Sequence, residues 1–132
     1  PVFLSGASGS QQAGLWFGLD EDNYVKLVLG NQGNGTVRFQ LLREQNALAG
    51  TGDEINTANL NAAAVPANAD VTLILIVNDA TNTATARYRI NGGAEVTVGS
   101  FAISQALFNG VDSDPGAAVR TLSFAGLFAT HR

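Results

Sequence analysis

Trp16, the single tryptophan of the chain, stands between Gly14 and Gly18 and is the residue best suited to hold a ligand. In a β-strand, residues two apart point to the same face, so the two glycines would leave the indole ring clear of its neighbours along the strand. A flat aromatic ring exposed in this way can stack on a sugar. The alternative is that Trp16 packs beneath a loop or a further strand, with the glycines making room for it.

Four polar side chains are expected beside Trp16. If the first two hairpins reverse symmetrically, Trp16, Lys26 and Gln40 form one row across three strands. The same face then also carries Tyr24 and Arg38. Such side chains could bond the hydroxyl or carboxylate groups of a sugar. The sequence therefore predicts a ligand-binding platform made of Trp16, Tyr24, Lys26, Arg38 and Gln40.

The acidic segment after this strand suggests a metal site. Asp20 and Asp22 could supply oxygen ligands to calcium, which accepts carboxylates and carbonyls in flexible geometry. The alternative is a plain turn, because Asp and Asn side chains bond nearby backbone amides. A second acidic stretch at 112–116 leaves the same two alternatives, and its spacing does not match the twelve-residue calcium loop.

The sequence offers no set of groups for catalysis, and an enzyme is not expected. The only histidine, His131, lies next to the last residue. Glycoside hydrolysis needs two carboxyl groups that face the sugar, whereas Glu44 and Glu95 are isolated from other acids. Arg87 and Arg89 share a strand face and could bind an anionic group, with a solvated surface as the alternative.

The elements that would position these residues are β-strands. Apolar residues alternate or run in short blocks between clusters of Asn, Gly, Asp and Thr, and no long stretch keeps a helical period. Strands are predicted over 12–18, 23–30, 36–44, 71–78, 84–91, 94–98 and 119–130, with a weaker strand near 55–61 and a helical turn over 103–108.

Symmetric hairpins give one consistent core face. Reversal at 20–22 pairs Leu15 with Leu27, and reversal at 31–35 pairs Phe39 with Leu27. The apolar residues of the first three strands then share one face, and the platform residues occupy the other.

Two later segments carry further predictions. Residues 71–77 are apolar on both faces, as expected of a central strand covered on both sides. Gly92 and Gly93 readily supply positive φ, which predicts a tight hairpin between the strands at 84–91 and 94–98.

Composition limits the partners. The 132 residues are 45% hydrophobic, enough for one domain over 1–132. Seven basic and eleven acidic residues give a net charge of −4, which does not provide the positive surface that nucleic acids or anionic membranes require. No segment approaches the roughly 20 apolar residues of a membrane span, so membrane insertion is not expected. The chain has no cysteine, so the fold relies on its core without disulfides or thiolate metal sites. It begins at Pro1 rather than Met, which suggests a fragment of a larger chain.

The segments QAGLWFG (12–18) and DNYVKL (22–27) resemble concanavalin A-like lectin/glucanase jelly-roll domains of large secreted bacterial multidomain proteins. The order of 71–79, ARYRING (86–92) and LSFAGLFA (122–129) resembles the later strands of such domains. The resemblance implies an all-β fold, an antiparallel two-sheet jelly-roll sandwich that lacks its N-terminal strands. The histidine-containing metal motif of legume lectins does not carry over, because the only histidine lies at the end of the chain.

The resemblance also implies a function: a non-catalytic carbohydrate-binding module of a secreted or cell-surface protein, with a glycan as its partner. Exposed sheet edges can be completed by an upstream segment or a second chain. The alternative is therefore a structural or adhesive spacer domain that assembles with such a partner and has no glycan site, since one fold hosts many functions.

Overall fold

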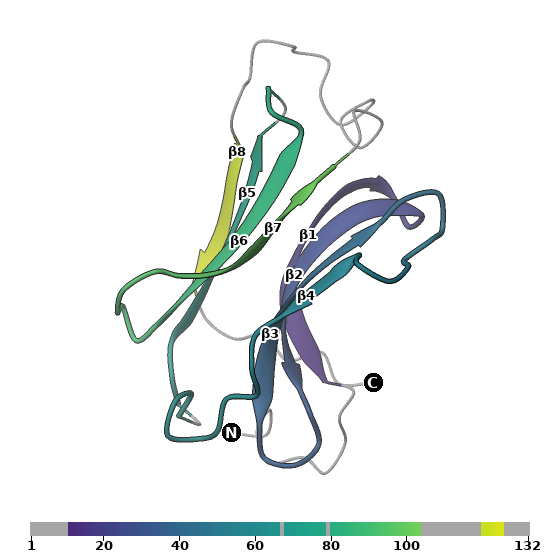
Figure 1. Ribbon diagram of the computed structural model, residues 1–132. Helices are drawn as coiled ribbons and strands as arrows, with labels where there is room; N and C mark the ends of the chain where they lie inside the picture. The colour runs from purple at the N-terminus through teal and green to yellow at the C-terminus, as the bar shows by residue number, and fades with distance from the viewer. Residues whose placement is uncertain (1–10, 67, 79, 104–119, 126–132) are drawn as a thin grey trace.

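The part of the chain that the structure describes is all-β, as predicted. The computed structural model describes residues 11–66, 68–78, 80–103 and 120–125. One antiparallel sheet contains, in spatial order, β1 (Gln12–Asp20), β2 (Asn23–Asn31), β3 (Val37–Glu44) and β4 (Glu54–Asn56) (Figure 1). The other, in the order β7-β6-β5-β8, contains β5 (Val71–Asn78), β6 (Thr83–Ile90), β7 (Val96–Ala102) and β8 (Arg120–Ala125). The described part of the chain contains no helix long and apolar enough to cross a bilayer.

The two sheets lie as two layers with one apolar core between them, a β-sandwich-like arrangement (Figure 1). Phe39 on β3 and Tyr88 on β6 stack across the interface, with ring centroids 3.8 Å apart and planes 9° from parallel. The largest apolar side chains that are essentially inaccessible to solvent come from β2, β3 and β5: Val25, Leu27, Leu29, Val37, Phe39, Leu41, Val71, Leu73, Leu75 and Val77.

The second sheet has the strand order of a Greek key. Strands β5, β6 and β7 follow one another, and β8 returns to pair with β5 on its other side. This confirms that residues 71–77 form a central strand, and Ile74, which points away from the core, is also buried.

The hairpin between β6 and β7 is also confirmed, although β7 begins at Val96 and not at residue 94. Positive φ angles occur at Asn91 (52°) and Gly92 (68°), and not at Gly93 as predicted. The Gly93 amide donates to the Ile90 carbonyl at 2.9 Å and closes the turn.

Strand β7 continues beyond its predicted end at residue 98, to Ala102. Glycine usually weakens a strand, but Gly99 is required here because the two sheets approach closely at this point. A Cβ on Gly99 would lie 2.7 Å from Cδ1 of Ile55, which belongs to β4 of the other sheet.

Three other predicted elements differ from the structure or fall partly outside it. The weak strand near 55–61 is the short strand β4, followed by a single bridge between Leu60 and Val37. Of the helical turn predicted over 103–108, only Ile103 is described, and it is not helical. The last predicted strand, 119–130, is described only over β8.

Strand β1 lies at the edge of the first sheet. Among the described strands it pairs with β2 alone. Completion of the sheet by an upstream segment or a second chain stays a prediction.

Candidate functional site

All five predicted ligand-binding residues lie on the face of the first sheet that points away from the core. We call this the outer face. Because side chains alternate along a strand, it is formed by the even-numbered residues of β2 to β4 and, up to the bulge after Gly18, of β1. Its members are Gln12, Gly14, Trp16, Gly18, Tyr24, Lys26, Val28, Gly30, Arg38, Gln40, Leu42, Glu44, Glu54 and Asn56.

The predicted row of Trp16, Lys26 and Gln40 is wrong in its last member. Trp16 does pair with Lys26, so the register of the first hairpin is confirmed up to a bulge after Gly18. In the second hairpin, however, Lys26 pairs with Leu42 and Gln40 pairs with Val28, so the predicted register is shifted by two residues.

The shift arises in the loop between β2 and β3. Asn31 pairs with Val37, so the loop comprises residues 32–36 and is not centred on Gly33 as predicted. The buried Asn31 side chain accepts a hydrogen bond from the Gly33 amide at 2.8 Å and supports this displaced reversal. A shift of two residues keeps every side chain on its face, so Gln40 stays on the outer face, about 7 Å farther from Trp16 along the strand.

Trp16 stands on the outer face with 50% of its surface exposed. Its ring leans on that of Tyr24, with centroids 5.8 Å apart and planes tilted by 32°. The Tyr24 hydroxyl donates to Glu44 Oε2 at 2.8 Å, which fixes the supporting ring. The indole is therefore braced on one side and open to a ligand on the other.

The structure explains why both residues that flank Trp16 on this face are glycines, a reason that the sequence alone did not show. A Cβ on Gly14 would clash with the Leu27 carbonyl oxygen and lie 2.7 Å from Cγ1 of Val28. A Cβ on Gly18 would clash with the Asn23 carbonyl oxygen and lie 2.5 Å from Cβ of Tyr24. The backbone and side chains of β2 therefore leave no room for a side chain at either glycine. As a result, Trp16 alone rises from the middle of β1 on this face.

Burial raises the pKa of the Tyr24 hydroxyl to about 12, and its hydrogen bond to the Glu44 carboxylate acts in the same direction. Because the folded pKa is above the unfolded value of about 10, the stabilisation is complete below pH 10 and is lost as the pH rises towards 12. We expect the difference in alkaline absorbance titration between the wild type and Tyr24→Phe to show a phenolate transition near pH 12. A transition near the ordinary tyrosine pKa would contradict the Tyr24 environment described here.

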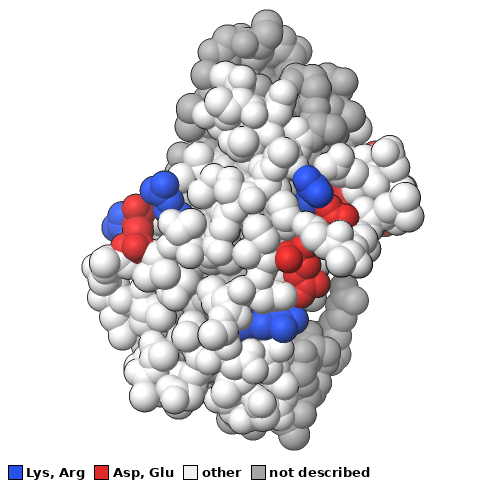
Figure 2. All heavy atoms as spheres, viewed as in Figure 1, with Lys and Arg blue, Asp and Glu red and all other residues white. Residues whose placement is uncertain are grey.

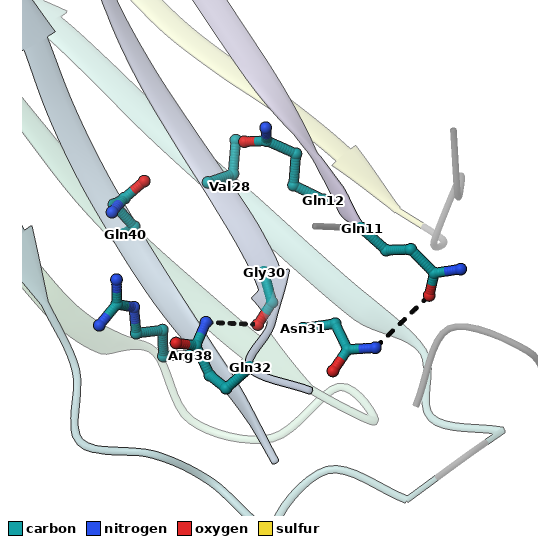
Figure 3. A pocket seen from close by; sticks show the side chains of 8 residues that line it. All are labelled: Gln11, Gln12, Val28, Gly30, Asn31, Gln32, Arg38 and Gln40. Carbon is teal, nitrogen blue, oxygen red and sulfur yellow. Dashed lines mark hydrogen bonds between the residues drawn. The ribbon is translucent and has the colours of Figure 1, made fainter. Parts of the chain in front are cut away.

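A polar hollow of about 290 Å³ opens on the outer face beside the Trp16 row (Figure 3). We call it the Gly30 pocket, because it exists where Gly30 has no side chain. A Cβ on Gly30 would meet nothing nearer than Gln32 Nε2 at 3.6 Å and the Arg38 carbonyl at 4.0 Å. The pocket is lined by Gln11, Gln12, Val28, Gly30, Asn31, Gln32, Arg38 and Gln40.

Side-chain amides dominate the wall of this pocket and surround the Gly30 position in Figure 3. Several are held in place: Gln32 Nε2 donates to the Gly30 carbonyl at 3.2 Å, and Asn31 Nδ2 donates to Gln11 Oε1 at 3.5 Å. Gln32 makes that one side-chain bond, so its amide keeps a second N–H donor and an acceptor oxygen, and Gln40, whose amide donates to Asn56, keeps its acceptor oxygen. The pocket therefore presents donors and acceptors together, which is what hydroxyl groups require.

Charges near the pocket occur in pairs of opposite sign. Arg38 Nη2 lies 3.4 Å from Glu54 Oε1. A hydrogen bond from the Asn56 amide holds the pKa of Glu54 below its ordinary value, and the charges of Arg38 and Lys26 reinforce this against the opposing effect of burial. Figure 2 likewise shows acidic and basic groups close together, with no broad patch of one sign on the face in view.

The arginine pair singled out in the sequence lies on the other sheet and shares one acid. Arg87 Nη1 and Arg89 Nη2 lie 3.5 Å and 3.2 Å from the two carboxylate oxygens of Glu95. Their charge is therefore partly neutralised within the β6–β7 hairpin.

At the predicted calcium position, Asp20 takes part in a turn. Its Oδ1 accepts hydrogen bonds from the Asp22 amide at 2.9 Å and from Asn23 Nδ2 at 3.0 Å. Across the described ranges, no three His, Cys, Asp or Glu side chains come together as a metal-binding group. Calcium binding by Asp20 and Asp22 stays a prediction.

Most residues of the pocket wall could not be recognised as binding residues from the sequence. Gln11, Gln12, Asn31 and Gln32 resemble ordinary strand-end and loop residues in sequence. The usable signal was Gly30, because a glycine in an apolar strand often marks a place where a ligand or another backbone approaches closely.

Comparison with protein-family models, curated proteins and solved structures finds no match to this chain. Function is therefore inferred from the geometry of the outer face.

Proposed function

We propose that the chain is a non-catalytic carbohydrate-binding module whose binding surface is the outer face of the β1–β4 sheet. The observation that carries the proposal is the position of an exposed aromatic ring beside a polar pocket on one rigid surface. The Gly14–Val28–Gln40 row, which borders the pocket, is next to the row that contains Trp16. Neighbouring rows on one face are separated by about 7 Å.

In this proposal, one unit of an oligosaccharide stacks its apolar face on the Trp16 ring while a unit farther along the same ligand enters the Gly30 pocket. The Gln12–Gly30–Arg38 row of that pocket lies two rows, or about 14 Å, from the row of Trp16. Gln12, Gln32 and Gln40 line that pocket and supply hydrogen bonds to hydroxyls. The ligand then runs along β1 and β2. Most of these side chains lie on strands, so binding requires little further ordering of the backbone. The free-energy cost of ordering is therefore small, which favours affinity.

The wider setting is part of the same proposal: a jelly-roll domain of the concanavalin A-like kind, in an extracellular or cell-surface protein. Two antiparallel sheets and the Greek-key order of β5 to β8 support the jelly-roll assignment. Catalysis is not proposed, since the pocket wall is made of amides, an arginine and apolar residues.

The alternative function is a spacer domain that assembles with a neighbouring segment or another chain. The position of β1 as the terminal strand of the described sheet β1-β2-β3-β4 supports it, because an edge strand can pair with a further strand. A spacer needs no sugar, so the two functions differ in glycan binding.

A broad glycan array, probed with and without calcium, tests the proposal. We expect selective retention, and we expect Trp16→Ala to weaken it by at least about 30-fold, equivalent to ~2 kcal/mol, because a central aromatic ring dominates such an interface. Leu48→Ala is the matched control, since Leu48 is 71% exposed and lies outside the outer face. Retention that Trp16→Ala leaves unchanged would reject this face as the binding site.

A further inference from the structure

The Gly30 pocket also indicates which class of sugar it accepts, an inference that rests on the proposed function. We infer that the pocket binds a neutral sugar unit and disfavours uronic acids, because Glu54 already neutralises the arginine in its wall.

Arg38 is part of a chain of contacts that crosses from β3 to β4. Its guanidinium lies 3.4 Å from Glu54 Oε1, and the same oxygen accepts a hydrogen bond from Asn56 Nδ2. Asn56 Oδ1 in turn accepts a bond from Gln40 Nε2 at 3.1 Å. Arg38 and Gln40 both line the pocket, so Glu54 and Asn56 hold two of its wall residues from behind.

The outer face as a whole has balanced charge. Its two cations, Lys26 and Arg38, are matched by its two anions, Glu44 and Glu54. Both cations act on Glu54, since each lowers the pKa of that carboxyl group. Glu54 therefore stays ionised at neutral and mildly acidic pH, and the neutralisation of Arg38 persists over that range.

A carboxylate entering the pocket would compete with Glu54 for Arg38 and would lie close to a like charge, which disfavours binding. A hydroxyl meets no such competition. It donates and accepts, and so uses both the N–H groups and the oxygens of the surrounding amides, whereas a carboxylate only accepts. The hydrogen-bonding groups of the pocket wall and its charge thus both favour a neutral sugar unit over a uronic acid.

Paired oligosaccharides on one array test this inference. Cellulose and mannan oligosaccharides are compared with glucuronan and mannuronan oligosaccharides of the same length, in which a carboxylate replaces each hydroxymethyl group. We expect the wild type to retain the neutral member of a pair at least about tenfold more strongly, a difference of ~1.4 kcal/mol.

Glu54→Gln provides the decisive comparison, because it keeps the size of the side chain and removes its charge. With Arg38 released, we expect retention of the uronate member to rise at least about tenfold, with little change in the thermal midpoint. Glu95→Gln is the matched control: it also removes a paired carboxylate, but on the other sheet, and should not change the preference.

The outcomes separate this inference from the proposed function. A wild type that prefers uronates, or a Glu54→Gln variant without gain for uronates, overturns the neutral-sugar assignment while carbohydrate binding stands. A wild type that binds nothing on the whole array overturns the proposed function, and the inference with it.

Discussion

Replacing Gly30 with leucine is expected to abolish glycan binding while the fold stays intact. The new side chain would occupy the pocket, since a Cβ at this position meets only ordinary contacts at 3.6 Å and beyond. Gly30 lies in a strand and does not have a positive φ, so leucine adds no backbone strain there. We expect affinity to fall at least about 100-fold, or ~2.8 kcal/mol, as measured by titration calorimetry. The thermal midpoint should stay the same or rise slightly, because glycine is unfavourable within strands.

Thr97→Leu is the matched control for this variant. It adds a similar side chain at an exposed strand position on the other sheet and should leave binding unchanged. If Gly30→Leu binds glycan as tightly as the wild type, the sugar does not enter the Gly30 pocket.

Truncating Phe39 to alanine is expected to produce a large loss of stability, about 3–5 kcal/mol. The Phe39 side chain is fully buried, and its ring stacks on Tyr88 of the opposite sheet at 3.8 Å. Alanine would leave a cavity where the two sheets meet and remove this contact. The loss is comparable with the whole free energy of unfolding of many domains of this size, about 5–15 kcal/mol. Urea denaturation measures it directly.

Phe39→Leu allows the loss of unfolding free energy at this position to be measured even if the alanine variant does not fold. It retains most of the apolar volume, so we expect a clearly smaller loss than for alanine. A Phe39→Ala loss below about 1 kcal/mol would be too small for a buried aromatic ring and would contradict the shared core of the two sheets.

The faces of the first three strands could be predicted from sequence because the side-chain period of a strand is two. Once Leu15 is placed opposite Leu27, every other residue follows, and Trp16 must point away from the core. The central position of β5 could also be predicted, because a run that is apolar on both faces, as at Leu73 and Ile74, is typical of a central strand.

Which residues lie opposite one another on neighbouring strands was harder to predict than which face they occupy. The pairing depends on how the chain turns between Asn31 and Val37, and that turn is stabilised by a bond from the Gly33 amide to the Asn31 side chain. Hydrophobic alternation is the same for registers that differ by two residues, so it cannot distinguish them. As a result, Gln40 was assigned to the wrong row but to the correct face.

The Gly30 pocket required the structure for a related reason. Its wall brings together Gln11 before β1, Gln32 in a loop and Gln40 on β3, residues that approach one another only once the register is known. The pairing of Arg38 with Glu54 likewise depends on the short strand β4, for which the sequence pattern is weak.

The most direct test of the central claim uses Trp16 as a reporter, because it is the single tryptophan of the chain. A glycan retained on the array is titrated into the wild-type protein while tryptophan fluorescence and calorimetric heat are followed together. We predict that emission changes saturably with the same dissociation constant as the heat, since the sugar covers a ring that is 50% exposed. Saturable heat without any change in Trp16 emission would place the glycan elsewhere and would contradict the assignment of the outer face as the binding surface.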